Sequence, residues 1–477
     1  MAKILGTGLA DTLPGTAFGD LIIAFDGDDE VAAGDGRDLV FGGRGDDSID
    51  GGAGDDYLFG GHDDDSLEGG EGDDFLHGGH GDDVAVYQGN SVDYAIEVRT
   101  DHKGRAIEIT LVEDLNTVDG DEGRDRLKKI ESVTFEGDGV TISVNSSIQL
   151  IDAGGNFAGF FQTIQDAVDA ASDGATVWIP DGVYEEQVVV TGLNGLTIEG
   201  ESEDGVIVRA PAGLPGVTIN DGLAPGFATG DVWGVIAVDG GSDISIENLS
   251  VDGAGQGASL PSSTDNFAGI YFHNTSGEIE HVTITGVRDA LDGSGNLAGT
   301  QRGNAVYVTN DDGTQRSFEL EHSTITDFQK TGVLVRNGDV EIERNHIDGG
   351  APEGGHTTIA QNGIQLSSGG TGEISRNVIE GIGYDNPADP NTDVGAILLF
   401  DTVGLEVTRN HITGESSQDV GVFSFGADDM TVRANRFTDL SEAIGDFGDI
   451  AIDNDINGLA NRYDNVGGSP RTTRIPR

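Results

Sequence analysis

The chain has 477 residues and a formal net charge of −60, because 85 Asp and Glu residues outnumber 25 Lys and Arg residues. This balance excludes a general affinity for nucleic acid, whose phosphates require basic surface, and it disfavours anionic membranes. The lack of cysteine excludes disulfides and thiol chemistry, and no apolar run reaches the roughly 18 residues of a membrane span. Cations are the partners that such a composition favours.

An aspartate recurs every nine residues between Gly6 and Val86, and an apolar residue follows each one two positions later. The units that begin at Gly42, Gly51 and Gly69 each open with two glycines. A fixed short period predicts a solenoid. Glycine permits its tight turns, and carboxylate oxygens are the hard ligands that calcium prefers. Residues 1–86 are therefore predicted to form a parallel β-roll that binds several Ca²⁺ ions.

This stretch resembles the RTX calcium-binding repeats of bacterial secreted proteins. The resemblance implies that two nonapeptides make one coil, so that aspartates of alternate units line the same edge. The predicted calcium ligands are Asp29, Asp38, Asp47, Asp56, Asp65, Asp74 and Asp83. The alternative is a disordered acidic tract, but disorder does not require an apolar residue in every unit.

The resemblance also implies an extracellular protein exported by a bacterial type I system. The stretch Met1–Gly6 is too short for a cleavable signal peptide. We therefore expect export without a cleaved signal.

The nine-residue period stops after Val86. Residues 87–144 are predicted to form a β-rich cap, because the segments 123–127 and 130–135 resemble those that close RTX rolls. Such a cap covers a sheet edge that would otherwise pair with another chain. Residues 145–156 are predicted to be a linker.

A second domain is predicted over residues 157–466. The apolar residues Phe161, Ile164, Val168 and Ala171 have helical spacing, and strand-like segments follow. This opening resembles the helix-capped entrance of a pectate-lyase-like right-handed parallel β-helix. The predicted fold class is thus all-β, with an N-terminal roll and a C-terminal β-helix that has a short capping helix. Residues 467–477 are predicted to be a disordered basic tail.

Two strand types recur in this second domain with coils of about 22 residues and insertions. One type places an asparagine at the same position in successive coils, so Asn345, Asn377, Asn410 and Asn435 are predicted to stack as an internal structural ladder. The other type alternates, which predicts one column of residues inside. That column is Ile270, Val306, Val333, Ile364, Ile397 and Val422.

The same alternation predicts that two tyrosines, a histidine and an arginine face outward from the second strand type. We assign His273 and Tyr271 as base or acid, Tyr307 as a second proton donor, and Arg336 with Lys330 as groups that neutralise a uronate carboxylate. Neutralising that carboxylate would stabilise the intermediate formed by proton abstraction at C5. The simpler interpretation is that these are ordinary strand residues.

The module content resembles secreted mannuronan C5-epimerases and related alginate-modifying enzymes. In those enzymes the β-helix comes first, and their Asp-Pro-His-Glu motif is absent from this chain. Two functions remain open: an enzyme of the uronate lyase or C5-epimerase type that acts on an acidic polysaccharide, and a non-catalytic glycan-binding or spacer protein of the cell surface or matrix. The catalytic function requires the candidate residues to lie in an open groove, whereas the non-catalytic function predicts that they are covered.

Overall fold

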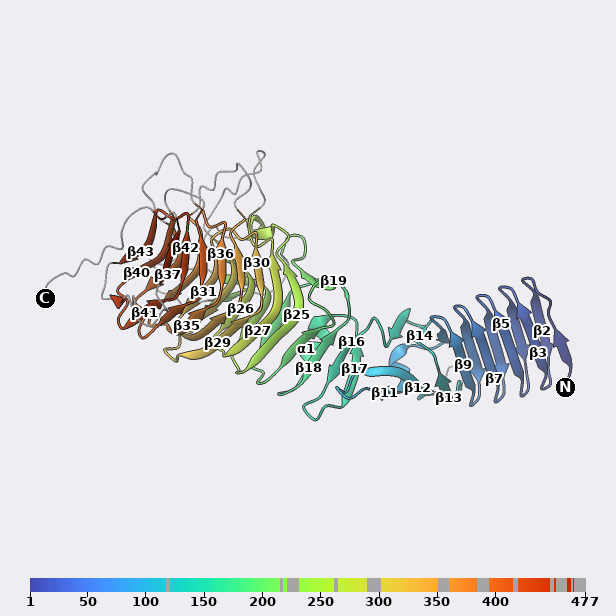
Figure 1. Cartoon of the computed structure of the whole chain (residues 1–477). Helices are drawn as coiled ribbons and strands as arrows, with labels where there is room; N and C mark the ends of the chain where they lie inside the picture. The colour runs from blue at the N-terminus through green and yellow to red at the C-terminus, as the bar shows by residue number, and fades with distance from the viewer. Residues whose placement is uncertain are drawn as a thin grey trace, which may run out of the picture. The chain divides into compact units, whose positions relative to one another are not determined.

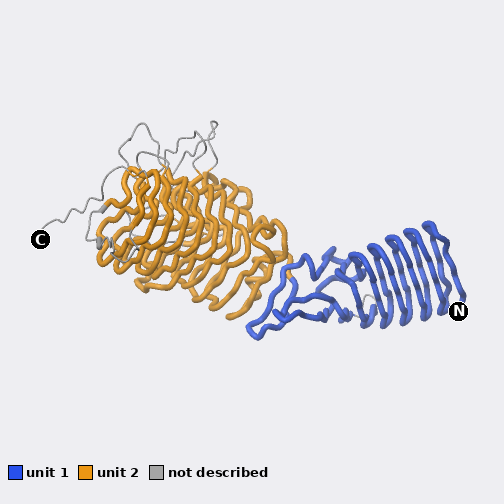
Figure 2. Tube along the Cα trace, viewed as in Figure 1, with its two compact units in different colours: residues 1–160 blue, residues 161–477 orange. Residues whose placement is uncertain are grey.

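The computed structural model describes the whole chain except residues 117–120, 215–217, 221–230, 261–264, 290–301, 351–359, 384–393, 415–418, 447–449, 452–460, 465 and 467–477. The predicted disordered tail therefore lies outside the described residues. The chain divides into two compact units, Met1–Phe160 and Phe161–Arg477 (Figure 2).

The first unit begins with a two-sheet parallel roll (Figure 1). Strands that lie 18 residues apart pair in parallel, so that Ile22 aligns with Val40 and Val40 with Leu58. One sheet contains β1 (Lys3–Leu5), β3 (Leu21–Asp26), β5 (Leu39–Arg44), β7 (Tyr57–His62) and β9 (Phe75–His80). The other contains β2 (Thr12–Thr16), β4 (Glu30–Gly34), β6 (Ser48–Ala53), β8 (Ser66–Glu71) and β10 (Val84–Tyr87).

The core of the roll is narrow because each nonapeptide contributes one main apolar side chain to it. Ile22, Val40 and Leu58 from one sheet are buried, as are Ile49 and Leu67 from the other. Strand alternation explains this burial, since every second side chain points between the sheets. The apolar residue of each nonapeptide therefore packs between the two sheets, as the sequence predicts.

The predicted cap continues both sheets of the roll. Strand β13 (Arg124–Lys128) pairs in parallel with β9, and β14 (Ser132–Phe135) pairs in parallel with β10. Strands β11 (Tyr94–Thr100) and β12 (Ala106–Asp114) complete the first sheet, and β15 (Val140–Ser143) the second. The cap thus supplies one further coil from residues that are not contiguous with the repeat.

The interval predicted to be a linker contains a strand. Strand β16 (Ile148–Ile151) is buried along its whole length, and β17 (Phe157–Phe161) follows it. Gln149 is fully buried, and its side-chain oxygen accepts the Ala106 N–H at 2.7 Å. This interval is therefore structured, and it falls within the first unit, which extends to Phe160.

The second unit opens with the predicted short helix, α1 (Ile164–Ala170). The helix begins three residues later than the apolar spacing suggested, because Thr163 is its N-cap and accepts the Asp166 N–H at 3.0 Å. Its buried side chains are Ile164, Ala167 and Val168. Among the described residues, no helix is long and apolar enough to cross a membrane.

Two parallel sheets form the β-helix. The sheet that we call the straight sheet contains β20 (Val188–Thr191), β24 (Asp231–Asp239), β26 (Asn266–His273), β28 (Gly303–Thr309), β31 (Thr331–Arg336), β34 (Asn362–Ser367), β37 (Val394–Phe400), β40 (Asp419–Phe425) and β43 (Glu442–Asp446). Strand β23 (Ile219–Asn220) pairs antiparallel with β24.

The other sheet, which we call the bent sheet, turns in successive coils at one residue with a φ between +50° and +59°. These residues are Asn248, His281, His322, Arg344, Arg376, Arg409 and Ala434. The strands before and along this bend are β18 (Thr176–Ile179), β19 (Gly182–Glu185), β21 (Thr197–Gly200), β22 (Val206–Arg209), β25 (Ile244–Asp252), β27 (Gly277–Thr285), β29 (Arg316–Glu321), β30 (Thr324–Thr326), β32 (Gly338–Glu343), β33 (His346–Asp348), β35 (Thr371–Ser375) and β36 (Val378–Glu380). The remaining strands are β38 (Glu406–Thr408), β39 (His411–Thr413), β41 (Met430–Arg433), β42 (Arg436–Thr438), β44 (Ile450–Ala451) and β45 (Arg462–Asp464).

The register predicted for the straight sheet is confirmed. Ile270 aligns with Val306, and Val306 with Val333, and the whole predicted inner column is fully buried. The asparagine ladder is confirmed as well. Asn377 donates from Nδ2 to Asn410 Oδ1 at 3.0 Å and to the Ile342 carbonyl at 2.8 Å. These bonds satisfy buried amides inside the solenoid.

Candidate functional sites

The aspartates of the roll form two hydrogen-bonded ladders, one on each edge. From Asp11 to Asp65, the backbone N–H of each repeat aspartate donates to Oδ1 of the aspartate 18 residues later. Asp47 N–H donates to Asp65 Oδ1 at 3.0 Å. Asp56 N–H donates to Asp74 Oδ1 at 2.7 Å on the other edge. A backbone N–H therefore holds Oδ1 of each carboxylate. Because the carboxylate is planar, this bond also fixes where its second oxygen, Oδ2, points.

The other oxygen, Oδ2, is buried and without a hydrogen-bond partner in seven of these carboxylates. The seven residues are Asp29, Asp38, Asp47, Asp56, Asp65, Asp74 and Asp83, the set predicted to bind calcium. A methyl group at Gly60 would lie 2.2 Å from Asp65 Oδ2, so only glycine leaves room for that oxygen. A buried carboxylate oxygen without a donor is costly. Carboxylate oxygens are hard donors, and orphan carboxylate oxygens beside glycine turns fit the ligand preference of calcium.

At the N-terminal end of the ladders, threonine hydroxyls donate hydrogen bonds to the aspartate Oδ2 atoms. Thr7 Oγ1 donates to Asp11 Oδ2 at 2.9 Å, and Thr16 Oγ1 donates to Asp20 Oδ2 at 2.8 Å. Both carboxylates are thereby satisfied within the protein. The unpartnered oxygens begin only at Asp29.

The cap completes both ladders at the other end, with two residues that the sequence analysis did not select. Asp74 N–H donates to Asp125 Oδ1 at 2.8 Å, and Asp83 N–H donates to Glu131 Oε2 at 2.9 Å. Asp125 Oδ2 accepts the Tyr87 hydroxyl at 2.9 Å, so this carboxylate needs no cation. The Gly-x-Asp-x-Leu spacing of residues 123–127 matches the repeat and could have identified Asp125.

Burial, with a smaller contribution from neighbouring carboxylates, raises the pKa of the seven aspartates with an orphan oxygen. The pKa of Asp65 rises to about 8, and those of Asp56 and Asp74 to about 7. These three carboxylates are therefore partly or mostly protonated at neutral pH, where isolated aspartates are ionised. Calcium binding requires the release of these protons, so bound calcium and bound protons compete for the same oxygens.

The predicted catalytic tyrosines face outward from the straight sheet, but they are not accessible. Tyr271 and Tyr307 are fully buried, with ring centroids 5.1 Å apart. They belong to an apolar cluster outside the solenoid that also contains Ile219, Val232, Ala237, Ala268 and Leu334. The cluster includes Ile219 of β23, which the strand alternation could not reveal. Tyr271 and Tyr307 are therefore covered in this structure, whereas the catalytic function requires an open groove.

His273 ends strand β26 between two carboxylates. Its Nδ1 lies 2.7 Å from Asp239 Oδ1, and its Nε2 lies 3.3 Å from Asp311 Oδ1. The side chain is 11% exposed. The two carboxylates were not selected from the sequence as partners, although Asp239 precedes His273 in the same column. Nε2 also lies 3.0 Å from Asn274 Nδ2, so the imidazole is held at both nitrogens and its orientation is fixed.

The two predicted neutralising groups are not brought together. Lys330 precedes β31 and Arg336 ends it, and six residues of strand span roughly 20 Å. Lys330 Nζ donates to the Ala360 carbonyl at 2.6 Å, and burial lowers the pKa of Lys330 to about 8. The Arg336 guanidinium lies 5.7 Å from the centroid of the Tyr307 ring. Of the two cations, only Arg336 shares the His273 end of the sheet.

Family profiles match both parts of the chain. The profile of the RTX calcium-binding nonapeptide repeat matches residues 5–40, 32–66 and 60–86. The profile of the right-handed β-helix region matches residues 233–444. The chain therefore contains RTX calcium-binding repeats, which are typical of secreted bacterial proteins, and a right-handed β-helix. A search of curated protein sequences found no significant match.

Solved structures of low sequence identity align with a large part of this chain. The A-module of mannuronan C-5 epimerase AlgE4 from Azotobacter vinelandii is 12% identical, with a TM-score of 0.34, over 64% of this chain and 91% of that one. Pectin methylesterase PemA from Erwinia chrysanthemi is 14% identical, with a TM-score of 0.30, over 56% and 86% of the two chains. These values describe likeness of fold.

Proposed function

We propose that this chain is a secreted protein whose roll folds on calcium and whose β-helix binds an acidic extracellular polysaccharide. The observation that carries the calcium dependence is the set of seven buried carboxylate oxygens without hydrogen-bond partners. Thr7 and Thr16 donate to the carboxylates at the N-terminal ends of the two ladders, and Tyr87 donates to Asp125 at the other end of one of them. Between those limits a divalent ion is the missing partner.

Calcium dependence suits a protein that must cross a cell envelope before it folds. Extracellular calcium sites have dissociation constants of about 10⁻⁴–10⁻³ M. At tenfold excess over such a constant, each site stabilises the folded state by about 1.4 kcal/mol. Several stacked sites then determine whether the roll is folded, and at micromolar calcium this contribution vanishes. We infer type I export of the open roll and folding outside the cell.

The non-catalytic form of the proposal has the stronger support. A polymer could not reach the Tyr271 and Tyr307 hydroxyls without displacing the apolar cluster that contains Ile219. Because both the protein and the polymer are polyanions, association would depend on bridging calcium as well as on local cations such as Arg336.

The catalytic form is a second candidate, and His273 supports it. In that form, His273 would act as the base, Asp239 and Asp311 would orient it, and Arg336 would face the uronate carboxylate. The tyrosines Tyr271 and Tyr307 could take part only if the apolar cluster that covers them were displaced. Lys330 could take part only if it left the Ala360 carbonyl.

One experiment separates the two forms. Binding to immobilised alginate, pectate and hyaluronan is measured with calcium, with magnesium and with chelator, and the same polymers are assayed for unsaturated uronates and for altered sugar composition. The proposal predicts calcium-dependent binding without a new product. A product that disappears in His273→Gln would establish the catalytic form. Absence of both binding and product on every polymer would refute the polysaccharide proposal.

A further inference from the structure

Two histidines occupy adjacent positions at the bend of the bent sheet. His281 and His322 both have positive φ, at +53° and +50°. Their rings stack with centroids 5.1 Å apart and an interplanar angle of 5°. The parallel register aligns Glu280 with Glu321, which brings the two bends one above the other.

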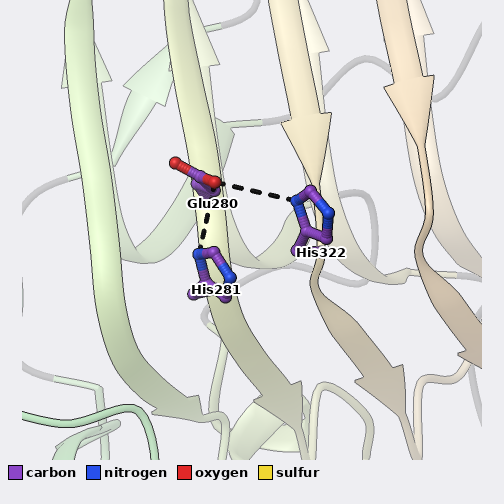
Figure 3. A group of neighbouring side chains, drawn as sticks. All are labelled: Glu280, His281 and His322. Atoms are coloured by element: carbon purple, nitrogen blue, oxygen red, sulfur yellow. Dashed lines mark ion pairs between the residues drawn. The ribbon is translucent and has the colours of Figure 1, made fainter.

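A single carboxylate oxygen lies close to both imidazoles (Figure 3). Glu280 Oε1 is 3.3 Å from His281 Nδ1 and 3.7 Å from His322 Nδ1. Glu321 Oε2 lies 3.6 Å from His322 Nδ1. The His281 and His322 side chains are 49% and 36% exposed, so an ion can reach them from solvent. Glu280, His281 and His322 thus offer three potential metal ligands. In the part of the chain that the structure describes, they are the only group of three or more His, Cys, Asp or Glu side chains with ligand atoms within 4.8 Å of one another.

The following coils provide an internal comparison. There the bend carries Arg344 and Arg376, and both guanidinium groups pair with Glu343, Arg344 at 2.6 Å. Glu343 is the register partner of Glu321. A guanidinium neutralises the carboxylate but offers no lone pair, whereas a neutral imidazole offers a lone pair and no charge. The histidine coils thus have metal ligands where the arginine coils have built-in counter-ions.

The surrounding surface favours a cation. Glu278, Glu319 and Glu341 align on consecutive coils of the same sheet. This column adds negative potential next to the histidine pair.

We propose that Glu280, His281 and His322 form a surface site for a divalent transition-metal ion, with zinc as its test ion. Two imidazole nitrogens and one carboxylate oxygen leave a fourth position for water or a ligand. Imidazole suits zinc, copper and nickel, whereas calcium takes oxygen ligands. The ion bridges two coils of the β-helix and is chemically distinct from the ions of the roll.

The test is a calorimetric titration of zinc into the full chain without a polyhistidine tag, in buffer with enough calcium to saturate the roll. We expect one zinc ion per chain. His281→Gln should weaken zinc binding by more than the about 10- to 100-fold that changes outside the ligand shell cause. The double variant H281R/H322R reproduces the arginine coils, and it should keep the circular dichroism and melting temperature of the parent while losing the zinc site.

Two further variants make the result decisive. Glu280→Gln keeps both histidines and should also weaken zinc binding. If the arginine variant does not fold, this variant still tests the proposed ligand set. His62 and His80 of the roll stack at 4.9 Å with an interplanar angle of 18°, but they are not part of a three-ligand group among the described residues. H62Q/H80Q should therefore retain the site. Absence of zinc binding in the parent, an unchanged site in H281R/H322R, or its loss in H62Q/H80Q would overturn the proposal.

Discussion

The roll and the β-helix are both parallel solenoids, but they treat buried polar groups in opposite ways. The β-helix buries asparagines whose amides bond to one another and to backbone carbonyls, as Asn377 does with Asn410 and Ile342. The roll buries carboxylates such as Asp56 and Asp65, each with one oxygen unpartnered. The asparagine ladder satisfies its buried hydrogen-bonding groups within the protein. The aspartate ladders leave buried carboxylate oxygens without a donor, so the roll requires a cation to neutralise them.

The largest effect should come from removing two adjacent ligands on one edge of the roll. We expect D56N/D74N to lower the number of calcium ions bound and to raise the calcium concentration needed for folding, because two of the three carboxylates with an orphan oxygen on that edge lose their charge. Calorimetry gives the stoichiometry, and circular dichroism gives the folding midpoint. Asp20→Asn is the matched control, since Thr16 already satisfies that carboxylate. Equal calcium dependence in both variants would show that position in the ladder is irrelevant.

In the β-helix, Asn377→Ala should destabilise the fold to the same extent with and without calcium. The substitution leaves the Ile342 carbonyl and the Asn345 N–H unpartnered in a buried site. Each orphaned group costs about 1–3 kcal/mol. Thermal unfolding in calcium and in chelator measures this loss. If the stability of the β-helix fell only in chelator, the β-helix would depend on calcium as the roll does, and the contrast between the two solenoids would not hold.

Without calcium, the stability of the roll should fall as pH rises. The folded roll raises the pKa of Asp65 to about 8 and of Asp56 to about 7, above the value of 3.8 for an exposed aspartate. The folded state therefore holds more protons than the unfolded state between about pH 4 and pH 8, and stability declines across that window. Circular dichroism in calcium-free buffer from pH 4.5 to 8.5 tests this. Stability that rises with pH would contradict the assignment of these carboxylates as buried and unpaired.

The smallest effect concerns the helix that opens the β-helix. Thr163→Ala removes the side chain that accepts the Asp166 N–H, which should cost about 1 kcal/mol. Chemical denaturation of the full chain measures this loss, and Thr163→Ser should restore most of it. No difference between alanine and serine would show that the cap contributes nothing.

Periodic features could be predicted from the sequence because each depends on local spacing. The nine-residue period placed the seven aspartates, and strand alternation placed the inner column from Ile270 to Val422. The features that spacing missed depend on distant residues. Asp125 joins its ladder 51 residues after Asp74. Ile219 of β23 packs in the cluster that buries Tyr271, and nothing in the pattern of β26 indicates that contact.

Two further differences from the sequence analysis have simple physical origins. Residues 145–156 are predicted to be a linker, yet Ile148 and Leu150 are buried in strand β16. Lys330 and Arg336 are assigned together as neutralising groups, but the length of β31 keeps their charges apart. The candidate ion site at His281 and His322 went unnoticed because the two residues lie in different coils and 41 positions apart.

Hydrogen exchange of the full chain in calcium and in chelator tests the central claim most directly. We predict that chelation abolishes amide protection across residues 29–83 and leaves that of the asparagine-ladder coils, such as those with Asn377 and Asn410, unchanged. Full protection of residues 29–83 in chelator, with no calcium taken up in calorimetry, would contradict the account.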